Sequence, residues 1–230
     1  MKTIFIHGAG GTGAAWHYQV RRFADADAVT LPGHPDGEPC DSVEGYARWL
    51  RDYIAGKNYG PSVLAGQSMG GGIALSYALS YPGDTAGLVL IGTGARLRVL
   101  PAFLDALSAN AGKPPSAMKD ILMSFYGDVD RPVREMVWER QSAVPVSVHL
   151  NDFKCCDRFD MLDAVAGIRV PTLIVCGEKD AMTPPKYSRY LADAIPGSRL
   201  AIIAGAGHMC FLEKPDEVNE EIDRFMRNVP

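Results

Sequence analysis

The sequence has no surplus of basic residues and no long apolar run. Its 230 residues include 23 basic and 27 acidic side chains, for a formal net charge of −4, so it offers no positive field for nucleic acid or anionic lipid. No stretch approaches the ~18 apolar residues of a membrane span, and the apolar start of the chain is too short for a secretory signal. We therefore expect a soluble, cytoplasmic protein that binds neither nucleic acid nor membranes.

Cysteine is also sparse. The five cysteines are odd in number and contain no CxxC pair, a pattern that indicates neither a disulfide framework nor a structural zinc site. Cys176 lies within an apolar run and is expected to be a small core residue. We predict a structural role for the adjacent Cys155 and Cys156, and no bound metal.

The apolar content is ordinary for a globular protein. Hydrophobic residues make up 47% of the chain, enough for one sizeable core. At about 150 residues per domain, the length corresponds to roughly 1.5 domains. This ratio favours a single domain with one insertion over two complete cores.

Short apolar runs rich in β-branched residues alternate with longer amphipathic stretches, which is typical of a parallel sheet covered by helices on both faces. We predict a doubly wound, mostly parallel α/β fold. Its six strands are expected at Lys2–Ile6, Ala28–Leu31, Ser62–Ala65, Leu88–Ile91, Val170–Cys176 and Arg199–Ile203. Apolar spacings of three and four predict helices near Gly13–Phe23, Ser42–Ala55, Met69–Tyr81, Pro185–Ala194 and Pro215–Asn228.

The alternation is interrupted once, between the fourth and fifth predicted strands. About 75 residues lie there, and their spacing predicts several short helices. We expect residues 96–163 to form an inserted helical cap, with residues 1–95 and 164–230 forming the core domain. The cap helices are predicted near Leu100–Ala109, Ser116–Phe125, Pro132–Ala143 and Val146–Cys156.

A glycine-rich loop directly follows the first predicted strand. Residues 8–13 are Gly-Ala-Gly-Gly-Thr-Gly and fit the GxGxxG pattern of dinucleotide-binding loops. That pattern also needs an acidic residue at the carboxyl end of the second strand. Asp25 and Asp27 have the spacing but precede the predicted strand Ala28–Leu31. An NAD(P)-binding oxidoreductase is therefore a minor alternative, and we predict no cofactor.

A second motif, Gly-Gln-Ser-Met-Gly at residues 66–70, lies between a short apolar strand and a helix. It fits GxSxG, the pattern of a nucleophile elbow, in which the serine occupies a sharp strand-to-helix turn with its hydroxyl exposed. Glycine on either side lets the neighbouring backbones approach closely. Ser68 is therefore the candidate nucleophile, although a serine in a glycine-rich helix start is the alternative.

A serine nucleophile needs a base and a carboxylate that orients it. Of the five histidines, His208 follows the last predicted strand in a glycine-rich loop, whereas the other four have simpler structural explanations. Asp180 follows the fifth strand and is the favoured carboxylate, with Glu178 as a nearby rival. The order Ser68, Asp180, His208 is the chain order of an α/β-hydrolase triad.

With these motifs placed, the sequence resembles the α/β-hydrolase superfamily over nearly its whole length. Residues 7–11 look like the family's oxyanion loop, and residues 31–34 like its Pro-Gly-His turn. The resemblance implies that the backbone amides of Ala9 and Met69 form the oxyanion hole. It also implies a compact member that begins at the family's third strand. The related hydroxynitrile lyases carry Thr and Lys where this chain has Gly8 and Met209, so hydrolysis is favoured.

The expected function is hydrolysis of small to medium uncharged carboxylic esters through an acyl-enzyme intermediate. Lactone or thioester hydrolysis by the same triad is the alternative, and a non-catalytic ligand-binding protein is a less favoured one. Acyl selectivity would come from apolar side chains over Ser68. The candidates for substrate binding are Trp16, Phe103, Leu104, Met123 and Trp138. The sequence predicts no particular oligomeric state.

Overall fold

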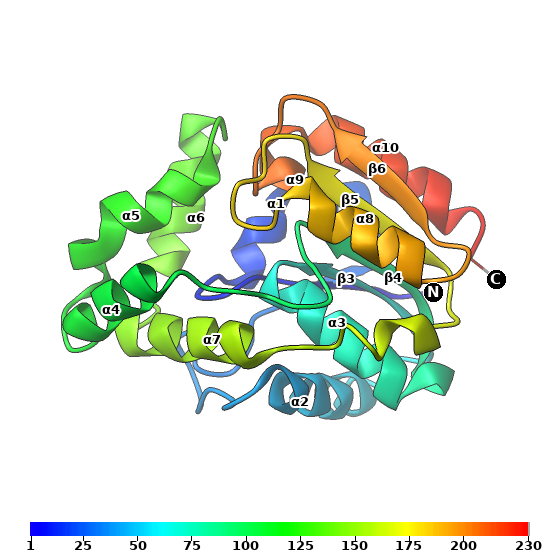
Figure 1. Ribbon diagram of the computed structural model, residues 1–230, viewed down its shortest axis with the longest axis horizontal. Helices are drawn as coiled ribbons and strands as arrows, with labels where there is room; N and C mark the ends of the chain where they lie inside the picture. The colour runs from blue at the N-terminus through cyan, green and yellow to red at the C-terminus, as the bar shows by residue number, and fades with distance from the viewer. Residues whose placement is uncertain (230) are drawn as a thin grey trace.

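The computed structural model describes residues 1–229 and is built on one six-stranded sheet. The strands lie in the order β2-β1-β3-β4-β5-β6, and every neighbouring pair is parallel (Figure 1). They are β1 (Thr3–Ile6), β2 (Ala26–Val29), β3 (Ser62–Gln67), β4 (Thr85–Ile91), β5 (Thr172–Gly177) and β6 (Arg199–Ile203). The predicted six-stranded parallel sheet is confirmed.

Helices cover both faces of this sheet. Because successive strand residues point to opposite faces, Ile4 and Ile6 of β1 join one buried cluster, and Phe5 joins the other. The first cluster lies beneath α2 (Val43–Gly56), α3 (Met69–Ser80) and α8 (Pro185–Ala194). The second lies beneath the 3₁₀ turn η1 (Gly13–Trp16), α1 (His17–Arg22), α9 (Cys210–Glu213) and α10 (Pro215–Met226). Within residues 1–229, no helix is long and apolar enough to cross a membrane.

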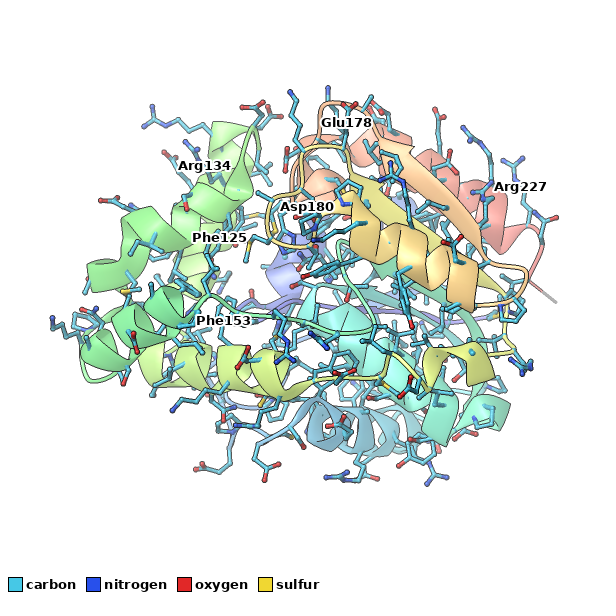
Figure 2. The ribbon with its side chains drawn as sticks, viewed as in Figure 1. Phe125, Arg134, Phe153, Glu178, Asp180 and Arg227 are labelled. Carbon is cyan, nitrogen blue, oxygen red and sulfur yellow. The ribbon has the colours of Figure 1, made fainter. Side chains whose placement is uncertain are left out.

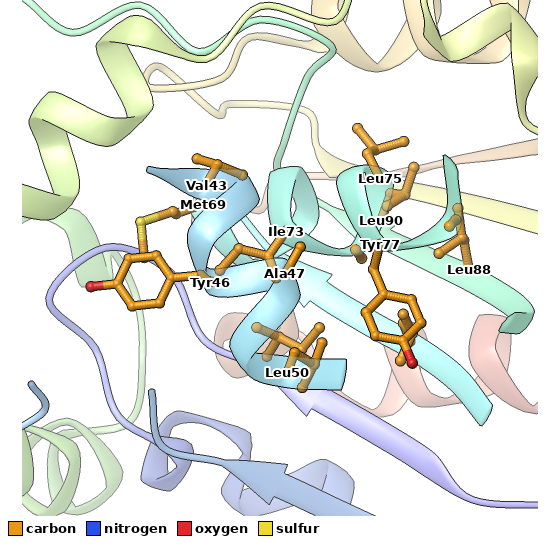
Figure 3. Close-up of a cluster of buried hydrophobic side chains, with 14 of the residues drawn as sticks. Val43, Tyr46, Ala47, Leu50, Met69, Ile73, Leu75, Tyr77, Leu88 and Leu90 are labelled. Atoms are coloured by element: carbon orange, nitrogen blue, oxygen red, sulfur yellow. The ribbon is translucent and has the colours of Figure 1, made fainter. Parts of the chain in front are cut away.

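Helix α2 shows how the sequence produces one of these layers. The Ser42 hydroxyl accepts a hydrogen bond from the Gly45 amide and caps the helix N-terminus. The apolar residues of α2 then recur every three or four positions and are buried toward α3 and the sheet (Figure 3). They are Val43, Tyr46, Ala47, Leu50 and Ile54.

The segment between β4 and β5, residues 96–163, contains most of the remaining helices. They are α4 (Pro101–Asn110), α5 (Lys119–Met123), α6 (Arg131–Gln141) and α7 (Val146–Arg158), and the 3₁₀ turn η4 (Ser124–Tyr126) follows α5. Figure 1 shows α4, α5 and α6 together at one end of the molecule, with α7 running back toward α3. We call residues 96–163 the inserted segment.

Several predicted boundaries differ from the structure. The second strand lies at Ala26–Val29 instead of Ala28–Leu31, because residues 26–29 are the ones that pair in register with β1. The single helix predicted at Gly13–Phe23 is a 3₁₀ turn followed by a short α-helix. β4 begins at Thr85, earlier than predicted, and pairs with the whole of β3.

Candidate active site

Ser68 occupies a sharp turn between β3 and α3. Its backbone has φ +53° and ψ −117°, a conformation that costs a non-glycine residue about 1–3 kcal/mol. The flanking glycines permit this turn, since a Cβ on Gly66 would collide with the Gly70 carbonyl, and one on Gly70 with the Ile6 carbonyl. The Ser68 carbonyl is fixed by the Thr93 hydroxyl, which donates to it at 2.8 Å. The turn therefore has the geometry of a nucleophile elbow.

His208 and Asp180 form a buried hydrogen-bonded pair. His208 Nδ1 lies 2.9 Å from Asp180 Oδ2. The carboxylate also accepts from the backbone amides of Met182 and Thr183, at 2.9 and 2.8 Å, and from the Thr183 hydroxyl at 2.7 Å. Burial alone would raise the pKa of Asp180, but the bonds from His208 and Thr183 outweigh burial and hold it below the usual value. An ionised Asp180 keeps the proton of the imidazole on Nδ1 and leaves Nε2 as an acceptor.

The acceptor nitrogen of His208 is bonded to Gln67, the residue that precedes the candidate nucleophile. The Gln67 side-chain amide nitrogen lies 2.9 Å from His208 Nε2. Within residues 1–229, no hydrogen bond joins the Ser68 hydroxyl to His208, although both line the same cavity. In enzymes without bound substrate, the hydrogen bonds between catalytic groups are often long or poorly aligned, and they tighten only when the substrate binds. Sequence reasoning missed Gln67, whose position inside the GxSxG motif is its one local signal.

The loop after β1 lies against the Ser68 turn. A Cβ on Gly8 would meet the side chain of Gln67 and come within 3.2 Å of Ser68 Cβ. The Ala9 amide and the Met69 amide donate no hydrogen bond within residues 1–229. Both amides are therefore free to donate to a ligand, as the donors of an oxyanion hole must be.

His7, the residue before this loop, holds it through hydrogen bonds from its ring. Its Nδ1 lies 2.8 Å from the Gly8 carbonyl, and its Nε2 accepts from the Leu31 amide at 3.0 Å. Burial, with a smaller contribution from His34, lowers the pKa of His7 to about 3. His7 is therefore a neutral ring that joins two loops, a structural role of the kind expected for the histidines other than His208.

Asp152 of α7 connects the inserted segment to the same loop. The side chain is fully buried and accepts from the Gly10 amide, the His34 ring and the Tyr46 hydroxyl, each at 2.8 Å. Burial would raise the pKa of Asp152, but His34, Gly10 and Tyr46 together keep it below its usual value. Sequence reasoning did not identify Asp152, because each donor comes from a distant part of the chain.

The cavity beside Ser68 and its mouth, which is open to solvent, together amount to about 520 Å³. Figure 2 shows Phe125 and Phe153 of the inserted segment on the side of the cavity opposite Asp180. The lining from the inserted segment consists of Leu122, Phe125, Tyr126, Gln141 and Phe153. The core contributes His7, Gly8, Ala9, Gly11, Ala15, Gln67, Ser68, Met182, His208 and Met209.

The five residues predicted to bind substrate are not part of this lining. Trp16 is completely buried between Phe5 and Phe211 in the core. The other four pack within the inserted segment or against the core: Phe103, Leu104, Met123 and Trp138. Helical spacing identifies apolar positions but does not distinguish a packing face from one that borders a cavity.

Asp27, one of the two acidic residues considered for a dinucleotide site, has a different role. Asp27 lies within β2, not before it, and its carboxylate accepts from the hydroxyls of Tyr53 and Tyr59 at 3.0 and 3.1 Å. The glycine loop itself borders the cavity of Ser68.

Comparisons with known proteins identify the family and the fold of the chain. Residues 3–221 match the sequence profile of the alpha/beta hydrolase family. A thermophilic esterase of known structure is 34% identical, with a TM-score of 0.84 over 99% of this chain and 90% of that chain. The pimeloyl-[acyl-carrier protein] methyl ester esterase of Neisseria meningitidis serogroup C is 29% identical over 92% of this chain and 88% of its own length. The enol-lactonase of Burkholderia xenovorans LB400, 20% identical, shares the fold with a TM-score of 0.88 over 99% of this chain and 92% of that chain.

Proposed function

Because the chain belongs to the alpha/beta hydrolase family, we propose that it hydrolyses carboxylic esters with Ser68 as the nucleophile. One observation carries the proposal: Ser68 on its strained turn lines the same cavity as His208, whose ring is hydrogen-bonded to Asp180 behind it. The esterases among its relatives support an ester hydrolase. The residues supply every group that acyl transfer through a serine requires.

The first half of the proposed reaction forms an acyl-enzyme. Substrate binding exchanges the hydrogen bond from Gln67 to His208 Nε2 for one from the Ser68 hydroxyl. Ser68 Oγ then attacks the ester carbonyl carbon while His208 Nε2 takes its proton. The carbonyl oxygen becomes an oxyanion and accepts from the amides of Ala9 and Met69.

The intermediate collapses when the bond to the alcohol oxygen breaks and His208 returns its proton to that oxygen. In the second half, a water molecule gives a proton to His208 Nε2 and attacks the acyl-enzyme. The acid leaves, and the proton returns to Ser68 Oγ. Throughout, Asp180 holds the Nδ1 proton of His208 and stabilises the imidazolium that forms in each half.

The cavity favours small to medium uncharged esters. Among the described residues, no Lys, Arg, Asp or Glu lines it, and its wall toward the inserted segment is largely apolar. Lactones and thioesters remain the second candidates, because the same groups attack their carbonyl carbons and one structural neighbour is an enol-lactonase. The inserted segment would act as a cap that selects among these substrates.

Ser68→Ala is the direct test, measured with p-nitrophenyl butyrate. We expect turnover to fall by at least about 10³-fold, because removing one member of a triad leaves only the oxyanion hole and substrate binding. Ser80→Ala, at the exposed end of the same helix, is the matched control and should retain wild-type turnover. A folded Ser68→Ala protein with wild-type turnover would refute the proposal. Failure of the wild type to cleave esters, lactones and thioesters alike would favour a non-catalytic ligand-binding protein.

A further inference from the structure

Beyond the catalytic groups, the cavity contains one polar pair in an otherwise apolar wall. Gln141, the last residue of α6, lines the cavity beside Leu122, Phe125 and Phe153. Its partner is Tyr126 of the turn η4. Both side chains come from the inserted segment, opposite the Ser68 turn. An amide at this position is unexpected, because burying an amide without a partner is unfavourable.

The hydrogen bond between these residues fixes which end of the amide is free. The Tyr126 hydroxyl donates to Gln141 Oε1 at 2.8 Å. Tyr126 is buried, and burial raises the pKa of its phenol, so the hydroxyl keeps its proton and remains a donor. Gln141 Oε1 is therefore occupied, and the amide nitrogen is the end that remains available.

The amide nitrogen of Gln141 is not completely enclosed. Only 5% of the Gln141 surface is accessible, yet its nitrogen is not among the fully enclosed polar atoms that lack a partner within residues 1–229. No hydrogen bond from this nitrogen is present in the same residues. Since Gln141 lines the cavity, the cavity is where this donor can meet a ligand.

We propose that Gln141 Nε2 binds a second, uncharged oxygen acceptor of the substrate, such as an ether, ketone or hydroxyl oxygen. This inference rests on the proposed ester hydrolysis and specifies its substrate class. A purely hydrocarbon group displaces water from the cavity and leaves the amide donor unpaired, whereas an oxygen acceptor satisfies it. Sites built around such a donor discriminate against analogues that lack the acceptor. Charged substituents are disfavoured, because no Lys, Arg, Asp or Glu of the described chain lines the cavity.

The test compares matched esters in which one methylene group is replaced by oxygen. On the acyl side, p-nitrophenyl pentanoate is compared with p-nitrophenyl 3-methoxypropanoate. On the alcohol side, butyl acetate is compared with 2-methoxyethyl acetate. The quantity measured is the ratio of kcat/KM for the ether to kcat/KM for the hydrocarbon, in the wild type and in Gln141→Leu. Dividing the wild-type ratio by the variant ratio cancels the different intrinsic reactivities of the esters.

We expect this quotient to be about 2 to 13 in one of the two arms, the range that corresponds to one lost hydrogen bond. The arm in which it appears identifies the half of the ester that faces the inserted segment. Gln141→Met, unbranched and similar in length, repeats the test if the leucine variant folds poorly. Phe125→Leu is the matched control, since it widens the cavity without adding a polar group and should change kcat/KM for both esters of a pair by the same factor.

A quotient near one in both arms would overturn the proposal. That result would leave ester hydrolysis itself untouched, because pentanoate cleavage by the wild type and its loss in Ser68→Ala are independent of Gln141. Tyr126→Phe keeps the Gln141 amide but removes the hydrogen bond to its oxygen. A quotient for Tyr126→Phe between one and the value for Gln141→Leu would support the amide orientation fixed by Tyr126. A quotient of one for Tyr126→Phe would contradict this orientation.

Discussion

Three buried histidines surround the glycine loop, and each uses its ring differently. His7 bonds to the backbone with both nitrogens, and His34 bonds to carbonyl oxygens and to Asp152. His149 has no hydrogen-bond partner for either nitrogen among residues 1–229. Its ring fills the space beside Gly10, where a Cβ would collide with it. Identical side chains in one cluster therefore differ in their hydrogen bonds, and His149 is the one of these three that is buried without a partner among the described residues.

His149 gives a prediction for stability against pH. Burial lowers its pKa from 6.5 to about 4, so the unfolded chain binds this proton at a higher pH than the folded chain does. The free energy of unfolding must therefore fall as the pH drops from 6.5 toward 4, by up to about 1.4 kcal/mol per pH unit for this group. We expect His149→Phe to lose less stability than the wild type between pH 7 and pH 5 in urea unfolding. His7, whose pKa is also lowered by burial, adds the same loss to both proteins. Equal losses would therefore show that His149 contributes none of the acid sensitivity.

At the scale of elements, α7 both lines the cavity, through Phe153, and contacts the core through Asp152. Asp152 on this helix accepts from the Gly10 amide, next to the proposed oxyanion donor Ala9. The same carboxylate bonds to the His34 ring and the Tyr46 hydroxyl. One buried side chain of the inserted segment thus holds three parts of the core. The glycine loop is therefore tied to α7 through this contact.

Asp152→Asn tests this contact. The amide must direct an N–H group at one of the three donors, so one hydrogen bond is lost and the loop shifts. Loss of an oxyanion donor outright costs about 10²–10³ in kcat, and we expect displacement of the loop to lower kcat by at least about 10-fold, with a smaller change in KM. Asp157→Asn is the matched control, because Asp157 is also on α7 but accepts from Val99, away from the loop. If Asp152→Asn lowers the melting temperature but leaves kcat unchanged, the contact is purely structural.

Element boundaries show where local patterns are informative. The sequence predicts β3 and α3 closely, because an apolar run, a glycine-flanked serine and a second apolar run follow one another directly. It misplaces β2, because the pairing with β1 is decided by hydrogen bonds between segments more than 20 residues apart and not by local apolar content. It also predicts the helices of the inserted segment without their facing directions, and so names Phe103 where Phe125 lines the cavity.

At the scale of the whole molecule, the sheet brings separate motifs to one cavity. Ser68, Asp180 and His208 each follow a strand of the parallel sheet, and parallel strands deliver their following loops to the same edge. Local motifs together with strand order therefore predict this grouping. The contacts made by Gln67, Asp152 and Gln141 depend on tertiary packing across the cavity, and no spacing in the sequence encodes them.

The proposed hydrolysis requires that this assembly activates Ser68 as a nucleophile. The most direct measurement is reaction of the wild type with a p-nitrophenyl alkylphosphonate, in which Ser68 Oγ forms a bond to phosphorus and p-nitrophenolate leaves. We predict release of one equivalent of p-nitrophenolate per chain and the phosphonyl mass on the peptide that contains Ser68. Absence of a rapid stoichiometric release, or a label on any residue other than Ser68, would contradict the account.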